Sequence, residues 1–152
     1  MKMKIVYRLL LVLHGFVGIG AIAGGWAAMM NPMEPLGAPV DMLKNSPFDN
    51  FFIPGIILFS VIGLGNILSA LTILFKSKYQ GYISSVFGWA LVIWIVVQCI
   101  MIQGIHFLHI LFFIIGLVQG GLAATILFKE SLFPANILIA YYKQAEKEAH
   151  EE

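Results

Sequence analysis

Four uninterrupted apolar runs dominate this 152-residue chain and leave few folds open to it. The runs cover residues 5–30, 51–75, 82–102 and 107–128. A hydrocarbon core about 30 Å thick is crossed by about 20 helical residues, so each run is long enough to span a bilayer. Helix is the expected state because the backbone must satisfy its own hydrogen bonds in lipid. The pattern predicts an all-α, integral membrane, antiparallel four-helix bundle.

The composition excludes a water-soluble globule. Hydrophobic residues make up 60% of the chain and charged residues only 11%, which leaves too little polar surface to solvate a compact domain of this length. The formal net charge is +1, and the sequence has no basic stripe of the kind that binds nucleic acid. We therefore expect a lipid bilayer around this protein and no nucleic-acid partner.

The positive charges predict the orientation of the bundle. Only Lys44 lies in the first connection, and the other Lys and Arg residues share the opposite side: Lys2, Lys4, Arg8, Lys76, Lys78, Lys129, Lys143 and Lys147. The positive-inside rule then places both termini in the cytoplasm and residues 31–50 outside. The basic N-terminus and Ala21-Ile22-Ala23 also resemble a cleavable signal, but the apolar run continues to Met30, so we expect an uncleaved first span.

The segments outside the spans are also expected to be ordered. Residues 31–50 contain four prolines and are predicted to form an extracytoplasmic cap. Ser46 before Pro47 is a helix-start signal, and Pro54 then allows two interpretations. Either a short interfacial helix ends near Ile53 and the second span begins at Pro54, which we prefer, or the second helix is kinked at Pro54. The predicted division is a bundle over residues 1–130 and a cytoplasmic amphipathic helix over residues 131–152, which has apolar residues at helical spacing.

Small residues four apart occur in every span and predict close helix packing. The pairs are Gly20 with Gly24, Gly65 with Ser69, Gly81 with Ser85, Ser84 with Gly88, and Gly116 with Gly120. Small side chains let helix backbones approach where lipid supplies no hydrophobic drive for association. We expect these pairs to close the bundle, with dimerisation as the alternative.

Three polar side chains fall at one depth on three different spans. At about 1.5 Å per residue, His14 lies roughly 13 to 14 Å from the cytoplasmic end of its span, and Asn66 and Gln119 lie at about the same depth. Exposure to lipid there is costly, so we expect the three side chains to point inward and to pair. They form either a structural clasp or a proton or ligand path.

A second polar set is predicted nearer the outer surface. Trp94 and Gln98 share one face of the third span, and His106 and His109 lie at a similar height at the start of the fourth. Two histidines at this spacing can share a metal, but the pattern has no fixed third ligand. Interfacial histidines that bond to headgroups or to the cap are the preferred interpretation.

The chain carries none of the usual catalytic signatures, so the sequence assigns no catalytic residue and favours a protein that is not an enzyme. Its single cysteine, Cys99, rules out an internal disulfide. Bis-histidine haem ligation is disfavoured because His14 and His109 differ in height by roughly 15 Å. We predict no cofactor, and the alternatives left open are a haem or a divalent metal at His106 and His109.

Several short stretches resemble a widespread family of small four-helix bacterial membrane proteins. They are SPF at 46–48, FIPG at 52–55, GLGN at 63–66 and WIVVQ at 94–98, and the resemblance covers residues 24–121. It implies the four-span architecture and a bacterial inner membrane, and it implies no activity or cofactor. This chain has His109-Ile110 where relatives often have Gln-Pro, so the resemblance implies no role for His109.

These features favour an accessory or regulatory membrane protein that binds a lipid or a membrane-protein partner, the partner including a second copy of the chain. The alternatives are a small transporter or channel that uses the polar side chains at mid-depth, and a membrane enzyme or redox carrier. No Asp, Glu, Lys or Arg lies inside a span beyond its first turn, which disfavours ion-coupled transport.

Overall fold

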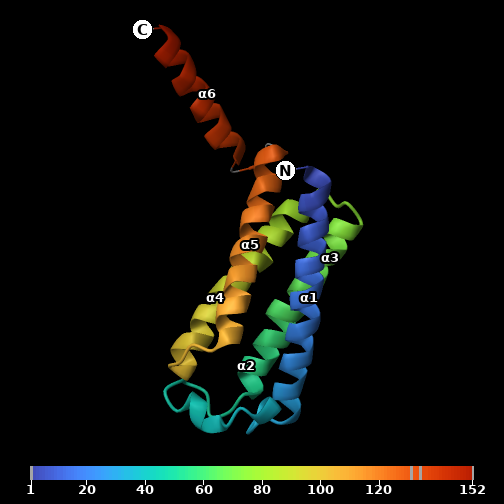
Figure 1. The fold of residues 1–152 in the computed structure, drawn as a ribbon, viewed down its shortest axis with the longest axis vertical. Coiled ribbons are helices and arrows are strands. Elements are labelled where there is room, and N and C mark those ends of the chain that lie inside the picture. Colours follow the sequence, from blue (N-terminus) through green and yellow to red (C-terminus); the bar gives the residue numbers. More distant parts are fainter. Residues whose placement is uncertain (1, 131, 134, 152) are drawn as a thin grey trace.

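The computed structural model describes residues 2–130, 132–133 and 135–151, and it is helical over most of that length. The helices are α1 (Met3–Met30), α2 (Phe52–Ile57), a π-helical segment (Leu58–Leu64), α3 (Gly65–Leu74), α4 (Gln80–Ile102), α5 (Phe107–Lys129) and α6 (Ala135–Glu151). No strand occurs among these residues. Consecutive spans run in alternating directions along one bundle (Figure 1).

Four helices are long and apolar enough to cross a membrane, which confirms the predicted multi-pass architecture. They are α1, the continuous helix Phe52–Leu74, α4 and α5. Their outward faces carry apolar side chains with more than half of their surface exposed, such as Val12, Ile19, Val86, Ile93 and Ile100. Such a surface is stable only against lipid or another apolar surface.

The second span starts differently from the prediction. The predicted helix from Ser46 and Pro47 is wrong, because Ser46 Oγ instead accepts a hydrogen bond from the Phe48 amide at 3.2 Å in a bend. Helix α2 starts at Phe52, whose amide donates to Asn50 Oδ1 at 2.9 Å. Pro54 therefore lies in the first helical turn, where its missing N–H breaks no helical bond. No break separates it from a preceding helix.

The buried face of α1 organises the core. Val6 and Leu10 pack with Ile73 and Ile126 towards the N-terminal end of α1. Val17 and Ala21 pack with Ile62, Leu91, Trp94 and Ile95 in the other half of the bundle. Between these two apolar clusters, the same face of α1 presents His14, which is fully buried. A polar layer thus separates the two halves of the core.

Glycines set the closest helix approaches, but on α1 they differ from the predicted pair. A Cβ at Gly20 would touch nothing within 4 Å, and one at Gly24 would make only ordinary contact with Leu58. The tight positions are Gly18 and Gly25, and a Cβ at Gly25 would lie 2.7 Å from the carbonyl oxygen of Gly55. The prediction that Gly20 and Gly24 bring α1 against a neighbour was therefore wrong.

Helices α4 and α5 pack closely through predicted small residues. A Cβ at Gly88 would lie 2.9 Å from the backbone nitrogen of Gly120, and one at Gly116 would lie 3.2 Å from the carbonyl oxygen of Gly88. Helix α4 contacts α5 extensively and α1 contacts the second span still more, whereas α1 contacts α5 much less. The seam between α1 and α5 is consequently the more open one.

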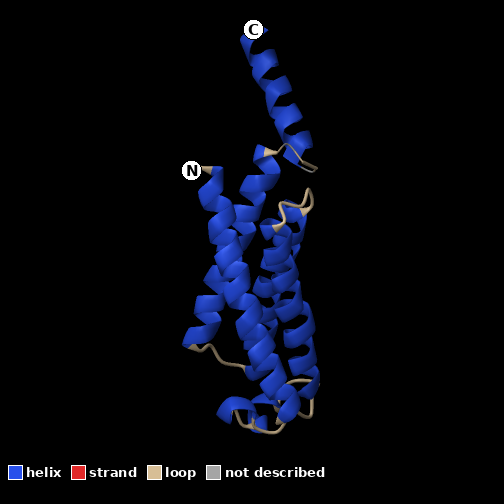
Figure 2. Cartoon of the chain, turned by 90° about the vertical axis from the view of Figure 1, so that its right-hand side faces the viewer, coloured by secondary structure: helices blue, strands red, loops and turns tan. Residues whose placement is uncertain are grey.

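The segment between α1 and α2 folds under one end of the bundle. It contains two short 3₁₀ turns, Pro35–Gly37 and Val40–Leu43, and the Leu43 side chain is buried. The Phe51 amide donates to the Pro32 carbonyl at 2.9 Å, and the Asn45 side chain donates to Gln103 at the end of α4 at 3.0 Å. Loops gather at the two ends of the bundle, and α6 projects away from it beyond α5 (Figures 1 and 2).

Candidate functional site

The polar layer consists of His14 from α1, Asn66 from α3 and Gln119 from α5, all fully buried. His14 Nδ1 lies 2.7 Å from Asn66 Oδ1, and Gln119 Nε2 lies 3.2 Å from the same oxygen. Three helices that are far apart in sequence thus meet at one amide oxygen. Whether the layer is a functional site or only a structural contact stays a prediction.

The hydrogen bonds of the Asn66 amide determine the tautomer of His14. The Asn66 amide nitrogen donates to the Ile62 carbonyl at 2.8 Å, so Oδ1 is the atom that faces His14. An amide oxygen only accepts, and His14 Nδ1 must therefore carry the proton that it donates. The 3.1 Å approach of Gln119 Nε2 to His14 Nδ1 is then a contact between two donors and not a hydrogen bond.

Two acceptors remain without partners in the polar layer. His14 Nε2 and Gln119 Oε1 are both buried and make no hydrogen bond. The hydroxyl of Ser84, on α4, is likewise buried and unpaired. A buried acceptor without a partner costs about 1–3 kcal/mol, so these atoms favour the presence of a donor such as water.

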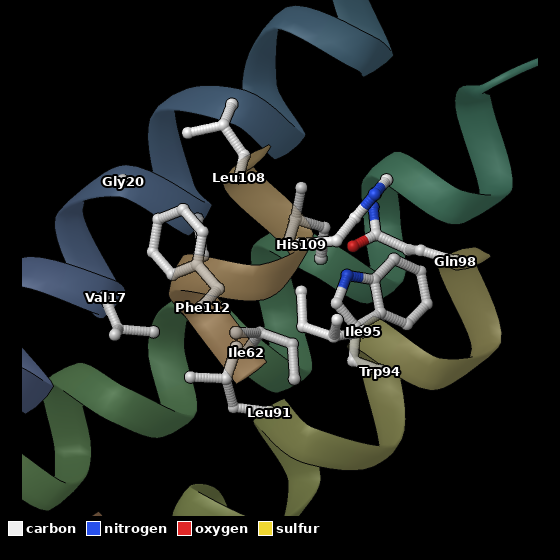
Figure 3. Close-up of a pocket in the computed structure, with 12 residues that line it drawn as sticks. Val17, Gly20, Ile62, Leu91, Trp94, Ile95, Gln98, Leu108, His109 and Phe112 are labelled. Atoms are coloured by element: carbon white, nitrogen blue, oxygen red, sulfur yellow. The ribbon is translucent and has the colours of Figure 1, made fainter. Parts of the chain in front are cut away.

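A cavity of about 200 Å³ lies between the polar layer and the end of the bundle that carries residues 31–50, and we call it the outer pocket because this end is predicted to face outward. All four spans line it, and most of its wall is apolar, including Val17, Leu58, Ile62, Leu91 and Phe112. Its polar lining comes from Trp94, Gln98 and His109. Figure 3 shows the polar ends of these three side chains gathered on one side of the pocket.

The indole N–H of Trp94 is the most unusual group in the outer pocket. The Trp94 side chain is only 7% exposed, and its Nε1 is buried without a hydrogen-bond partner. Tryptophan usually finds an acceptor for this donor when it is buried. The pocket wall therefore holds a hydrogen-bond donor that no protein atom satisfies.

His106 and His109 contact each other but have different surroundings. His109 Nδ1 accepts a hydrogen bond from the His106 amide at 3.1 Å, and the two rings lie 5.6 Å apart. His109 is partly buried and lines the outer pocket, whereas His106 is exposed at the start of α5 and does not line it. The structure therefore brings Trp94, Gln98 and His109 together along one cavity, without His106.

No group of three or more His, Cys, Asp or Glu residues within the described parts of the chain could hold a metal ion. Cys99 faces a second, more open groove of about 820 Å³ between α4 and α5. His109 lines that groove as well, and its ring therefore borders both spaces.

Comparison of the chain with family models, with curated proteins and with solved structures gave no match. The resemblance to a family of small four-helix bacterial membrane proteins therefore stays a prediction. Function has to be argued from the geometry of the polar layer and the outer pocket.

Two parts of the site were not predicted from the sequence. One is the π-helical segment Leu58–Leu64, which supplies Leu58 and Ile62 to the pocket wall. Segments of this kind are frequent at functional sites. The other is Gly20, which borders the pocket where its missing side chain leaves space. The sequence singled out Gly20 only as a packing residue, paired with Gly24.

Proposed function

We propose that this protein is an accessory membrane protein that binds a lipophilic molecule of the bilayer in the outer pocket. The Lys and Arg distribution supports an orientation with both termini in the cytoplasm, so that the pocket lies in the outer half of the bilayer, and the resemblance of the sequence to small bacterial membrane proteins supports an inner-membrane location. Pockets that bind small molecules are mostly apolar, with a few polar groups that orient the ligand. The outer pocket has this character.

The unpartnered indole N–H of Trp94 is the observation that carries the proposal. Burying such a donor without an acceptor costs about 1–3 kcal/mol. A phenylalanine would also place an aromatic ring there, without that cost. The donor is therefore best explained by an acceptor atom on a molecule that enters the pocket.

Native mass spectrometry of the gently solubilised protein tests the proposal. We expect a bound lipophile on the wild type, and we expect it to be lost in Trp94→Phe, which keeps the aromatic bulk and removes the donor. Trp89→Phe is the matched control, because Trp89 lies on the same helix, is 49% exposed and does not line the pocket. Equal occupancy in both variants, or none in the wild type, would contradict the proposal.

A further inference from the structure

The polar side of the outer pocket presents hydrogen-bond donors. Trp94 Nε1–H can only donate. His109 Nδ1 is engaged as an acceptor of the His106 amide, so in the neutral ring the proton resides on Nε2. The Gln98 amide makes no hydrogen bond to another described side chain and can turn its NH₂ group to the same place. These groups together select an acceptor atom on the ligand.

The acceptor is expected to be uncharged. No Lys or Arg lines the outer pocket, and the rest of its wall is apolar. An anion in such surroundings would lose its hydration without gaining a counter-charge. A carbonyl oxygen is a strong neutral acceptor that can take more than one hydrogen bond, and it matches the donors of Trp94 and His109.

The size of the pocket and its depth in the membrane limit the class of ligand further. A cavity of about 150 Å³ holds a benzene molecule, so about 200 Å³ holds a compact ring or short branched group with a carbonyl. Trp94 lies eight residues before Ile102, the end of α4, which places it about 12 Å inside the span. The ester carbonyls of a phospholipid stay near the headgroups, because the charged headgroup resists entering the hydrocarbon core. A lipophile without a charged headgroup fits this depth.

The pocket opens towards lipid between α1 and α5. Gly20 and Leu108 line it from these two helices, Gly20 is exposed, and Leu108 is 60% exposed. This is also the seam where the two helices contact each other least closely. Figure 3 shows Gly20 and Leu108 on the side of the pocket away from Trp94 and Gln98.

We infer that the outer pocket binds a compact, neutral, carbonyl-bearing lipophile that enters from the bilayer between α1 and α5, past Gly20. The inference rests on the proposed function, since it names the ligand class of the same pocket. The carbonyl oxygen accepts from Trp94 Nε1–H and His109 Nε2–H, and the apolar part lies against Val17, Ile62 and Phe112.

Acetophenone and α-methylstyrene are suitable probes, because they have nearly the same shape and differ in C=O against C=CH₂. Each is titrated into ¹⁵N-labelled protein in micelles, and the indole signal of Trp94 is identified by its loss in Trp94→Phe. We expect acetophenone to move this indole proton downfield and to bind at least about tenfold more tightly than α-methylstyrene, as one lost hydrogen bond implies. Benzoate is expected to bind more weakly than acetophenone.

Gly20→Leu tests the entrance and the location. A Cβ at position 20 meets nothing within 4 Å, so the leucine fits without a backbone clash and fills the mouth of the pocket. Gly15→Leu is the matched control, since Gly15 lies on the same helix with equally open surroundings and does not line the pocket. We expect Gly20→Leu to lose at least about tenfold in acetophenone affinity and Gly15→Leu to retain it.

The outcomes distinguish a wrong ligand class from a wrong proposed function. Equal binding of both probes without a downfield shift would overturn the carbonyl assignment while leaving the pocket as a binding site. Tighter binding of benzoate would overturn the neutral class. Unchanged affinity in Gly20→Leu would overturn the entrance past Gly20. If neither probe bound and no lipophile copurified with the wild type, the proposed function would fail as well.

Discussion

The polar layer and the outer pocket use similar side chains in opposite ways. In the polar layer, amide and imidazole groups from three helices converge on one oxygen, with His14 Nδ1 2.7 Å from Asn66 Oδ1. In the outer pocket, the polar ends of Trp94, Gln98 and His109 line a space of about 200 Å³ and do not bond to one another. The side chains of the polar layer bond to one another, whereas those of the outer pocket face a cavity.

This difference indicates which set is structural and which can bind a ligand. Polar groups inside a membrane protein are costly unless they are paired, so we expect the mutually bonded side chains of the polar layer to stabilise the bundle and the Trp94 donor of the pocket to need an external partner. The polar layer also lies between two apolar clusters that contain Leu10 and Val17, where it fixes the register of three helices. Both regions hold buried polar atoms without a partner, which are the acceptors His14 Nε2 and Gln119 Oε1 in the polar layer and the donor Trp94 Nε1 in the pocket.

Thiol labelling on intact cells tests the predicted orientation of the bundle in the membrane, and its expected effect is all or none. We expect a membrane-impermeant thiol reagent on intact cells to label Lys44→Cys and not Lys78→Cys, because the positive-inside rule places position 44 outside. Both side chains are exposed, and the measurement uses a Cys99→Ser background so that no other thiol reacts. Preferential labelling at position 78 would place the outer pocket in the cytoplasmic half.

Replacing Asn66 should produce the largest change in stability. Asn66→Ala removes the oxygen shared by His14 and Gln119 and leaves their donors buried without partners. We expect a loss of about 2–4 kcal/mol in the free energy of unfolding, measured by SDS titration in mixed micelles. Asn45→Ala, which removes an exposed amide, should lose less than about 0.5 kcal/mol.

A double-mutant cycle serves as the control for this interpretation. His14→Ala and Asn66→Ala should couple by about 1 kcal/mol, whereas His14→Ala and Gln119→Ala should couple less, because no hydrogen bond joins those two side chains directly and they only share Asn66 Oδ1. Small stability losses accompanied by a change in proton flux through proteoliposomes would instead identify the polar layer as a path.

Much of the architecture could be predicted from the sequence, because lipid restricts the backbone to helix. The predicted spans 5–30, 51–75, 82–102 and 107–128 agree with the helices Met3–Met30, Phe52–Leu74, Gln80–Ile102 and Phe107–Lys129 to within two residues at each end. The depth of His14, Asn66 and Gln119 followed from residue rise alone. That calculation needed no knowledge of side-chain packing.

The face that each helix turns towards its neighbours could not be predicted in the same way, because the depth of a residue does not determine its rotation about the helix axis. One residue turns an α-helix by about 100°, so choosing Gly20 and Gly24 over Gly18 and Gly25 pointed to the wrong face of α1. The heptad spacing of Gly18 and Gly25, with Ala21 and Ala28 between and beyond them, was a usable signal that all four lie on one buried face. The π-helical segment changes which residues of the second span face the core. The sequence periodicity of this short apolar stretch does not predict such a segment.

The smallest expected effect is the stability change in Trp94→Phe, and it tests most directly whether the polar layer and the outer pocket differ. Trp94→Phe removes a polar atom that has no partner, and it keeps an aromatic ring in the core cluster with Leu91 and Ile95. In protein stripped of lipid we expect the free energy of unfolding to change by less than about 1 kcal/mol, because removal of the unpaired donor offsets the packing lost with the smaller ring, in contrast to the larger loss in Asn66→Ala. SDS titration measures this change, with Trp89→Phe as the control. A loss above about 2 kcal/mol would mean that the indole N–H is already satisfied inside the protein, and the outer pocket would then be no different in kind from the polar layer.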